Sequence, residues 1–315
     1  MKQISCLFLF ACFSYSSSAK GPDTVKVGAY VISVHDINFH DKEYTIRFWL
    51  WFLNDKNPSF DFPNQLDITN AKSIDDPEPI ADTVSGKDWV MMKMKCVMKE
   101  TWQVHDFPFD KQHLKVEIEN SILDNSVLIF KPDLKGSMFS EHEAIDGWKI
   151  NNFKVSANEN TYQTGFGDPR EGRSQQTFSQ FSIDMDIERD AWGLFMKIFL
   201  GMYIAFLIAI ISFTPHPSAM EPRFGLPVGG LFAAVGNKYI IDSLLPESST
   251  FTLVDTLHAL TFIGIFATLV VSAIALTQYD SGKKELAERT NVLGAKIVVL
   301  LYIAFNILFI VLALI

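Results

Sequence analysis

Glu221 begins an apolar segment in which small, aromatic and polar residues recur at helical spacing. In a helix that turns about 100° per residue, six further residues fall on the same face, within about 60° of Glu221. They are Gly225, Val228, Phe232, Gly236, Tyr239 and Ser243. If this face lines a pore, a carboxylate at its mouth attracts cations and repels anions. The alternative role of Glu221 is to stabilise the positive N-terminal end of a helix.

Residue patterns typical of enzymes are missing from the sequence. It holds no Ser-His-Asp grouping in motif context, no glycine-rich phosphate loop, no paired metal-ligand cysteines and no zinc-type histidine spacing. We therefore expect no catalytic activity and no cofactor. A membrane-embedded enzyme that uses Glu221 and His216 is a remote alternative, because these two residues lie in no recognisable catalytic motif.

The composition indicates a membrane protein. Of the 315 residues, 48% are hydrophobic and 20% are charged, and the net charge is −9. This apolar share is high and the charged share is low for an ordinary soluble domain. The acidic balance argues against nucleic acid as a partner, because phosphate groups are bound by basic patches. The same charge suits an encounter with cations.

The sequence predicts a signal peptide at the N-terminus and membrane-spanning helices in the C-terminal part of the chain. Residues 1–19 carry Lys2, an apolar run and small residues up to Ala19, which is the order of a cleavable signal peptide. The apolar stretches after Arg189 predict four transmembrane helices, at about 191–213, 221–245, 251–277 and 291–315. Basic residues between the last two stretches indicate the inner side. We expect a multi-pass inner-membrane protein whose N-terminal domain and C-terminus face the periplasm or the outside.

The exported part, residues 20–190, has the pattern of an all-β domain. Short alternating or aromatic runs are separated by turn signals such as Asn57-Pro58 and Ser85-Gly86. We expect an antiparallel, immunoglobulin-like sandwich followed by an all-α domain of four helices, residues 191–315. Cys96 is the only cysteine after the signal, so no disulfide can form within the exported chain.

The segment Phe107-Pro108-Phe109-Asp110-Lys111-Gln112 resembles the Phe-Pro-Phe-Asp-x-Gln motif of pentameric ligand-gated ion channels, the Cys-loop receptor superfamily. The resemblance extends along the exported chain: a sandwich, an arginine before the first crossing, four helices and a Leu245-Pro246 turn after the second. Glu100 and Leu114 stand where the two loop cysteines would lie, and no long insertion precedes the fourth helix. Both departures are similar to the bacterial members, which include channels opened by protons or small amines.

The resemblance implies a homopentamer, in which each chain joins four identical subunits in the lipid bilayer. The second helix would line a pore for monovalent cations, with Glu221 as the selectivity ring and Phe232 or Tyr239 as the gate. It further implies a coupling interface between the sandwich and the helices, built from Asp36, Phe107, Pro108, Asp110, Arg189 and Pro246. The alternative for the acid and arginine residues is an ion pair that only stabilises the fold.

The resemblance also places an agonist site between subunits, in an aromatic pocket suited to amines. The implied residues are Trp49, Trp51, Tyr162, Phe166, Arg170 and Arg173. The two arginines favour a carboxylate-bearing or zwitterionic ligand over a simple quaternary amine. The agonist is otherwise an unknown small molecule or a proton, since histidines such as His35, His105 and His258 can titrate near neutral pH.

Two acidic clusters, Asp75-Asp76-Pro77-Glu78 and Glu141-His142-Glu143, are candidate Ca²⁺ sites, but solvated surface explains both of them better. The rival function is a membrane-anchored receptor module that binds a ligand without conducting ions. One crossing is sufficient for an anchor, so four crossings and the face that begins at Glu221 favour the channel.

Overall fold

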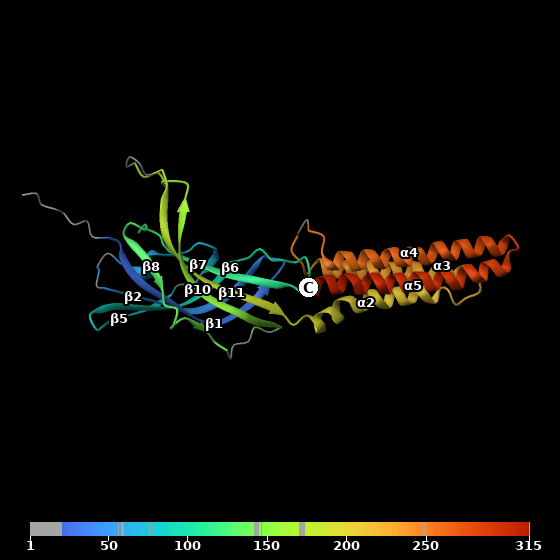
Figure 1. Ribbon diagram of the computed structural model, residues 1–315, viewed down its shortest axis with the longest axis horizontal. Coiled ribbons are helices and arrows are strands. Elements are labelled where there is room, and N and C mark those ends of the chain that lie inside the picture. Colours follow the sequence, from blue (N-terminus) through green and yellow to red (C-terminus); the bar gives the residue numbers. More distant parts are fainter. Residues whose placement is uncertain are drawn as a thin grey trace, which may run out of the picture.

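A computed structural model describes residues 21–55, 57, 60–75, 77–141, 145, 147–169, 174–247 and 250–314. It has a β-rich N-terminal region and a bundle of four long helices. The β-rich region and the bundle lie end to end, so the molecule is elongated (Figure 1). The expected signal, residues 1–19, lies outside the described residues. The β-rich region ends with β11 at Arg189, and the first long helix begins at Ala191.

The first sheet has the strand order β4-β6-β2-β1-β8, and β5 and β9 pair with β6 and β1. Its strands are β1 (Asp23–Asn38), β2 (Glu43–Asp55), β4 (Ala71–Ile74), β5 (Glu78–Val84), β6 (Lys87–Lys99), β8 (Leu128–Pro132) and β9 (Met138–Phe139). The second sheet has the order β10-β11-β7-β3. Its strands are β3 (Leu66–Ile68), β7 (Lys111–Asn120), β10 (Trp148–Tyr162) and β11 (Gln176–Arg189), and a short helix, α1 (Phe62–Gln65), precedes β3.

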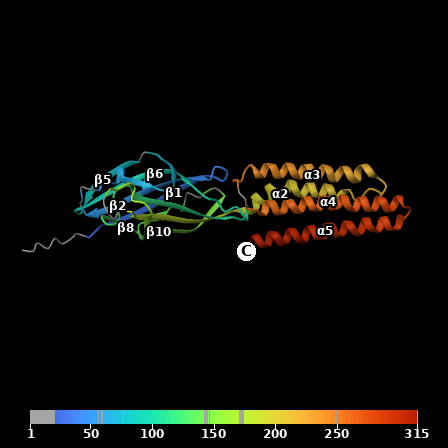
Figure 2. The same cartoon turned by 90° about the horizontal axis from the view of Figure 1, so that it is seen from above.

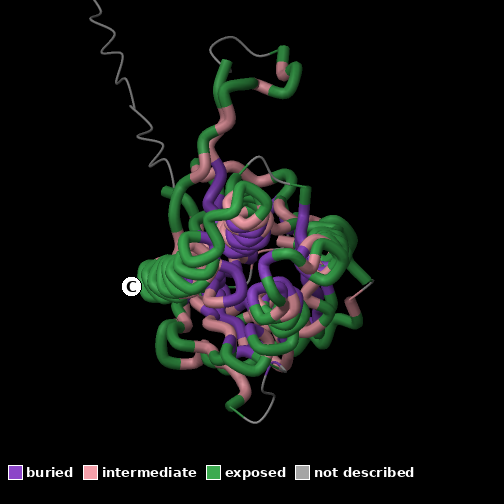
Figure 3. Tube along the Cα trace, turned by 90° about the vertical axis from the view of Figure 1, so that its right-hand side faces the viewer, coloured by how far each residue is buried: buried purple, intermediate pink, exposed green. Residues whose placement is uncertain are grey.

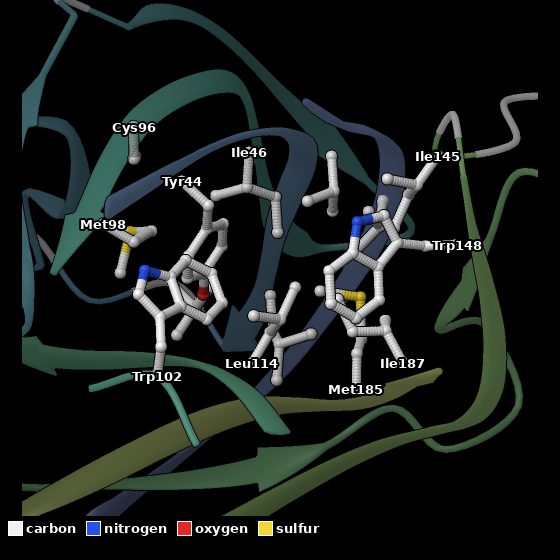
Figure 4. Close-up of a cluster of buried hydrophobic side chains, with 14 of the residues drawn as sticks. Tyr44, Ile46, Cys96, Met98, Trp102, Leu114, Ile145, Trp148, Met185 and Ile187 are labelled. Atoms are coloured by element: carbon white, nitrogen blue, oxygen red, sulfur yellow. The ribbon is translucent and has the colours of Figure 1, made fainter. Parts of the chain in front are cut away.

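One hydrophobic core lies between the two sheets. Alternate residues of β2, from Tyr44 to Phe52, are fully buried, as the period of two in a strand requires. In Figure 4, Tyr44 and Ile46 of the first sheet face Leu114, Met185 and Ile187 of the second. The Tyr44 hydroxyl donates to the carbonyl of Lys115, 3.0 Å away, so this buried hydroxyl has a hydrogen-bond partner.

The four long helices are α2 (Ala191–Ile211), α3 (Met220–Asp242), α4 (Leu253–Asp280) and α5 (Lys284–Leu314), and all four are long and apolar enough to cross a membrane. This indicates a multi-pass membrane protein. The last helix begins seven residues before the predicted boundary at 291. The first turns of this helix are charged, so they are not part of the apolar stretch from which the boundary was predicted. Their residues, among them Lys284, Glu285 and Glu288, are nevertheless good helix formers, so the helix begins before its apolar part.

The helices form a bundle in which α3 packs on α2 and α4, and α5 packs on α4. Seen from above, α3 and α5 lie on opposite sides of α2 and α4 (Figure 2). A close approach joins α2 to α3, because a Cβ on Gly230 would lie 2.6 Å from the carbonyl oxygen of Ala205. Viewed end-on, the buried residues gather between the helices, and α5 is mostly exposed (Figure 3).

Candidate functional site

The face of α3 predicted from helical spacing is solvent-exposed in the single chain. Glu221, Gly225, Val228, Phe232, Gly236, Tyr239 and Ser243 are all exposed. The exposed fraction is 72% for Phe232 and 78% for Tyr239. The opposite face, which includes Arg223, Pro227 and Ala234, is buried against the bundle. Two large exposed rings and an acid therefore share one side of a helix that has no neighbour there within the described chain.

Lys238 links α3 to α4 near the sheets. Its ammonium donates to both carboxylate oxygens of Asp242, at 2.8 and 2.9 Å, because residues four apart lie on the same face of a helix. It also donates to Asp255 of α4 at 2.7 Å. The turn between α3 and α4 brings this second partner close. Asp255 itself belongs to a capping box with Thr252, so Lys238 joins the end of α3 to the beginning of α4.

Asp110 and Arg189 meet where the sheets reach the helices. Arg189 Nε donates to Asp110 Oδ1 at 2.9 Å, and the carboxylate also accepts from Gln112 Nε2 at 2.7 Å. The Asp110 side chain is 1% exposed and that of Arg189 is 13% exposed. The guanidinium lies over the rings of Trp148, Phe39 and Phe107, at 4.0, 4.8 and 5.2 Å from their centroids. The aromatic rings therefore cover the ion pair and shield it from solvent.

The other predicted coupling residues are distributed around this pair. The Phe107–Pro108 peptide bond is cis, and Phe107 is buried beneath Arg189. Asp36 does not take part in the ion pair: its carboxylate is 76% exposed and lies 2.8 Å from Nδ1 of its neighbour His35. Asp36 lies near the end of β1, where its backbone has a positive φ of 53°, and its side chain points into solvent.

Pro246 is buried in the turn between α3 and α4 and lines a cleft of about 510 Å³ together with His40, Val104 and Tyr239. Next to this cleft, the amide of Leu253 at the start of α4 donates to the carbonyl of His105, 2.8 Å away. This is a direct backbone link between the loop before β7 and the beginning of α4. No side-chain pattern predicts this link, because both partners are backbone atoms.

The predicted ligand residues occupy two different sheets. Trp49 and Trp51 project from the outward face of β2. The Lys93 ammonium lies 5.6 Å from the ring of Trp49, while Trp51 packs against Gly28, where a Cβ would come within 2.3 Å of the indole. Tyr162 and Phe166 belong to the β10–β11 hairpin and contact each other edge to face. Arg170 and Arg173 lie outside the described residues.

A buried carboxylate that the sequence analysis missed lies beneath this hairpin. Glu119 of β7 is 3% exposed and accepts hydrogen bonds from Asn160, Tyr162 and Gln180, at 2.7, 3.0 and 2.7 Å. Burial and the Glu119 carboxylate raise the pKa of Tyr162 to about 12. All three donors are neutral, so the described hydrogen bonds leave the charge of Glu119 without a cation.

Two features extend the Glu119 cluster. Asp67 of β3 pairs directly with Glu119 of β7, so two carboxylates stand opposite each other across the strands. Such like-charge pairs are destabilising unless a cation lies between them. The ring of Phe178 contacts Tyr162 at 5.9 Å, and Phe166 is 61% exposed at the hairpin. The cluster therefore combines two acids with aromatic rings, which suits an ammonium group.

His113 lies on the same outward face of the second sheet. Its Nδ1 is 2.7 Å from Asp186 Oδ1, and its Nε2 is 3.2 Å from Asp184 Oδ1, so both ring nitrogens face acceptors. Asp186 also accepts from Asn152 at 2.9 Å. The hydrogen bond to Asp186, followed by the charge of Asp184, raises the pKa of His113 despite an opposing desolvation effect. The contacts therefore favour the charged imidazolium and join β7 to β11.

We expect His113 to make stability pH-dependent. A raised folded-state pKa stabilises the protein fully below the unfolded value of about 6.5, and this contribution is lost as the pH rises through the folded value. The melting temperature of the wild type should therefore fall more steeply between about pH 6 and pH 8 than that of His113→Gln. The exposed His40→Gln is the control, and parallel pH profiles for wild type and His113→Gln would contradict the assignment.

The remaining predicted sites are His258 and the two acidic clusters. His258 is buried, with Nδ1 at 2.8 Å from the carbonyl of Val254 and Nε2 at 3.2 Å from Asn237 Oδ1 of α3. Of the predicted Ca²⁺ clusters, Asp76, His142 and Glu143 lie outside the described residues. Among the residues whose placement is described, no group of three or more His, Cys, Asp or Glu is arranged to hold a metal ion.

Comparisons with protein-family models and with curated proteins find no match to this chain. The features of the molecule that bear on its function are therefore the exposed α3 face, the Asp110–Arg189 pair and the Glu119 cluster.

Proposed function

We propose that this protein is a cation-selective, ligand-gated channel formed by five copies of the chain. The observation that carries the proposal is the exposed face of α3, which places Glu221, Phe232 and Tyr239 along one side of a membrane-length helix. Exposed apolar side chains of membrane helices can face lipid, but a carboxylate on the same face as two large rings calls for a neighbouring subunit or an aqueous lumen. A closed ring of identical chains supplies both, because each α3 then faces a common axis.

The proposed assembly is that of a pentameric ligand-gated channel. The two sheets form the immunoglobulin-like ligand-binding domain on the periplasmic side, and the bundle spans the inner membrane with its C-terminus returning to the periplasm. The Glu221 carboxylates form a ring at the cytoplasmic mouth and attract monovalent cations. Phe232 closes the resting pore, because a ring of apolar side chains gives water no hydrogen-bond partner, and Tyr239 is the second constriction.

The ligand of the Glu119 cluster is a small organic cation. Glu119 and Asp67 supply negative charge, and Tyr162, Phe166 and Phe178 supply ring faces. A protonated amine brings three donors, which match the carboxylate oxygens better than a carboxylate-bearing ligand would. The described contacts thus favour an amine over the ligand class suggested by Arg170 and Arg173. Trp49 and Trp51 belong to the other sheet and meet such a ligand only from a neighbouring subunit.

Replacing Glu119 by glutamine should weaken amine binding. Butylamine is a suitable probe, with butanol as its uncharged counterpart, and binding to the purified full-length protein is measured by calorimetry. Removing a buried charge partner typically costs about 2 kcal/mol or more, so we expect about 30-fold weaker binding. Glu159→Gln removes an exposed acid from the same hairpin and should bind as the wild type does. Equal affinity for butylamine and butanol, or an unaffected Glu119→Gln, would contradict the amine site.

The assembly and conduction are tested together on the purified full-length protein. Electron microscopy of particles in lipid nanodiscs should show fivefold symmetry, and planar bilayers should show cation currents on addition of butylamine or on a change of pH. A monomeric or dimeric particle without currents would instead indicate the membrane-anchored receptor module.

A further inference from the structure

The first turn of α3 is poorly able to orient Glu221 by itself. Ala219 stands at its N-cap position and has no polar side-chain atom to bind the free amides. Pro227 lies inside the helix and has no N–H, so the carbonyl of Arg223 loses its helical donor. Gly225 adds backbone freedom between these two points. Something other than the helix backbone must therefore hold this turn.

Arg223 makes the contacts that hold the turn. It is fully buried, although it lies only two residues after the exposed Glu221. Its Nη1 donates to the carbonyl of Pro215 at 3.0 Å, and its Nη2 donates to Ser272 Oγ at 3.3 Å and to Asn291 Oδ1 at 2.6 Å. One guanidinium thus binds the α2–α3 turn, α4 and α5. The two helices that lie on opposite sides of the bundle, α3 and α5, are joined by this side chain.

Asn291 completes the arrangement. Its Nδ2 donates to the carbonyl of Phe213 at 2.9 Å, while its Oδ1 accepts from Arg223. Both Phe213 and Pro215 lie in the turn that connects α2 to α3. Arg223 and Asn291 therefore clamp this turn between them, and the turn leads directly into Glu221.

The charge of Arg223 is costly to bury. Within the described part of the chain, its hydrogen-bond partners are neutral oxygens and its Nε has no partner. A buried charge without a counter-ion is destabilising, and an apolar side chain would fill the same space at lower cost. The three-way contact instead provides geometric specificity, since the planar guanidinium fixes its partners in direction as well as distance.

We infer that Arg223 is the positioning residue of the selectivity ring: it sets the height and rotation of the first turn of α3, and thereby directs Glu221 into the pore. The inference rests on the proposed channel function. Side chains two residues apart on a helix diverge by about 160°, so anchoring Arg223 in the bundle turns Glu221 outwards. Without the anchor, the five carboxylates no longer lie at one level, and the ring discriminates less between cations and anions.

The test compares permeability ratios of full-length wild type, Arg223→Gln and Asn291→Ala in planar bilayers under a NaCl gradient. We expect the sodium-to-chloride ratio to fall about tenfold in Arg223→Gln, which corresponds to about 1.4 kcal/mol. Asn291→Ala keeps the arginine but removes the clamp, and its ratio should fall in the same direction. Lys296→Gln makes the same charge change at an exposed site and should retain the wild-type ratio.

Assembly is monitored in parallel by particle size and melting temperature, which a purely structural role would change without changing selectivity. A wild-type permeability ratio in Asn291→Ala, or in an assembled Arg223→Gln, overturns the inference. If the wild type conducts but Glu221→Gln leaves its ratio unchanged, the proposed role of Glu221 is what fails. The two outcomes are therefore distinguishable.

Discussion

Replacing Glu221 by glutamine should move the reversal potential of the channel towards zero. Under a tenfold NaCl gradient, a perfectly cation-selective pore reverses about 59 mV from zero. Glu221 is exposed on the first turn of α3, and in the proposed pentamer this puts one carboxylate per subunit at the pore mouth. Glutamine keeps the size of the side chain and removes the charge, so a change in the reversal potential reports electrostatics rather than pore width.

The matched control is Glu288→Gln, which removes an acid at the same end of the bundle but on α5, away from the α3 face. We expect it to reverse at the wild-type potential. A wild-type reversal potential in Glu221→Gln would show that this carboxylate only caps the helix. An equal shift in both variants would instead indicate a diffuse surface charge effect.

The elements that sequence analysis predicted best are those with one buried face. The alternation of β2 and the helical spacing of α3 both separate a packed side from an open side, and this separation survives in the structure. Strand β5 was missed because all seven of its residues are exposed, so it has no hydrophobic alternation. Its strand conformation comes from pairing with β6, which local sequence does not report.

Among the site residues, too, those marked by the local sequence were predicted and those that depend on distant partners were not. Asp110 and Arg189 were identified because a motif and a helix boundary mark their positions. Glu119 was missed because its burial depends on Asn160 and Gln180, which are 41 and 61 residues away in the sequence. Nothing in the sequence around Glu119 distinguishes it from the partly exposed Glu117 on the same strand.

The Asp110–Arg189 pair should be the most sensitive point of the fold outside the helices. Removing one partner of a buried ion pair leaves the other charge uncompensated and costs about 3 to 5 kcal/mol. We therefore expect Asp110→Asn and Arg189→Met each to lower the melting temperature of the purified protein strongly. Lys111→Gln alters the adjacent exposed residue and should leave it unchanged. A wild-type melting temperature in both single variants would contradict the burial argument.

The double variant separates a stabilising pair from a coupling element. Asp110→Asn combined with Arg189→Met has no unpaired buried charge, so part of the lost stability should return. Methionine cannot restore the cation–π contacts with Trp148 and Phe39, nor the directional bond that fixes the end of β11 two residues before α2. If the pair transmits agonist binding to the helices, the double variant should bind butylamine with wild-type affinity and yet open poorly. Recovery of stability and opening together would instead assign the pair to the fold alone, because transmission requires a contact that the double variant has lost.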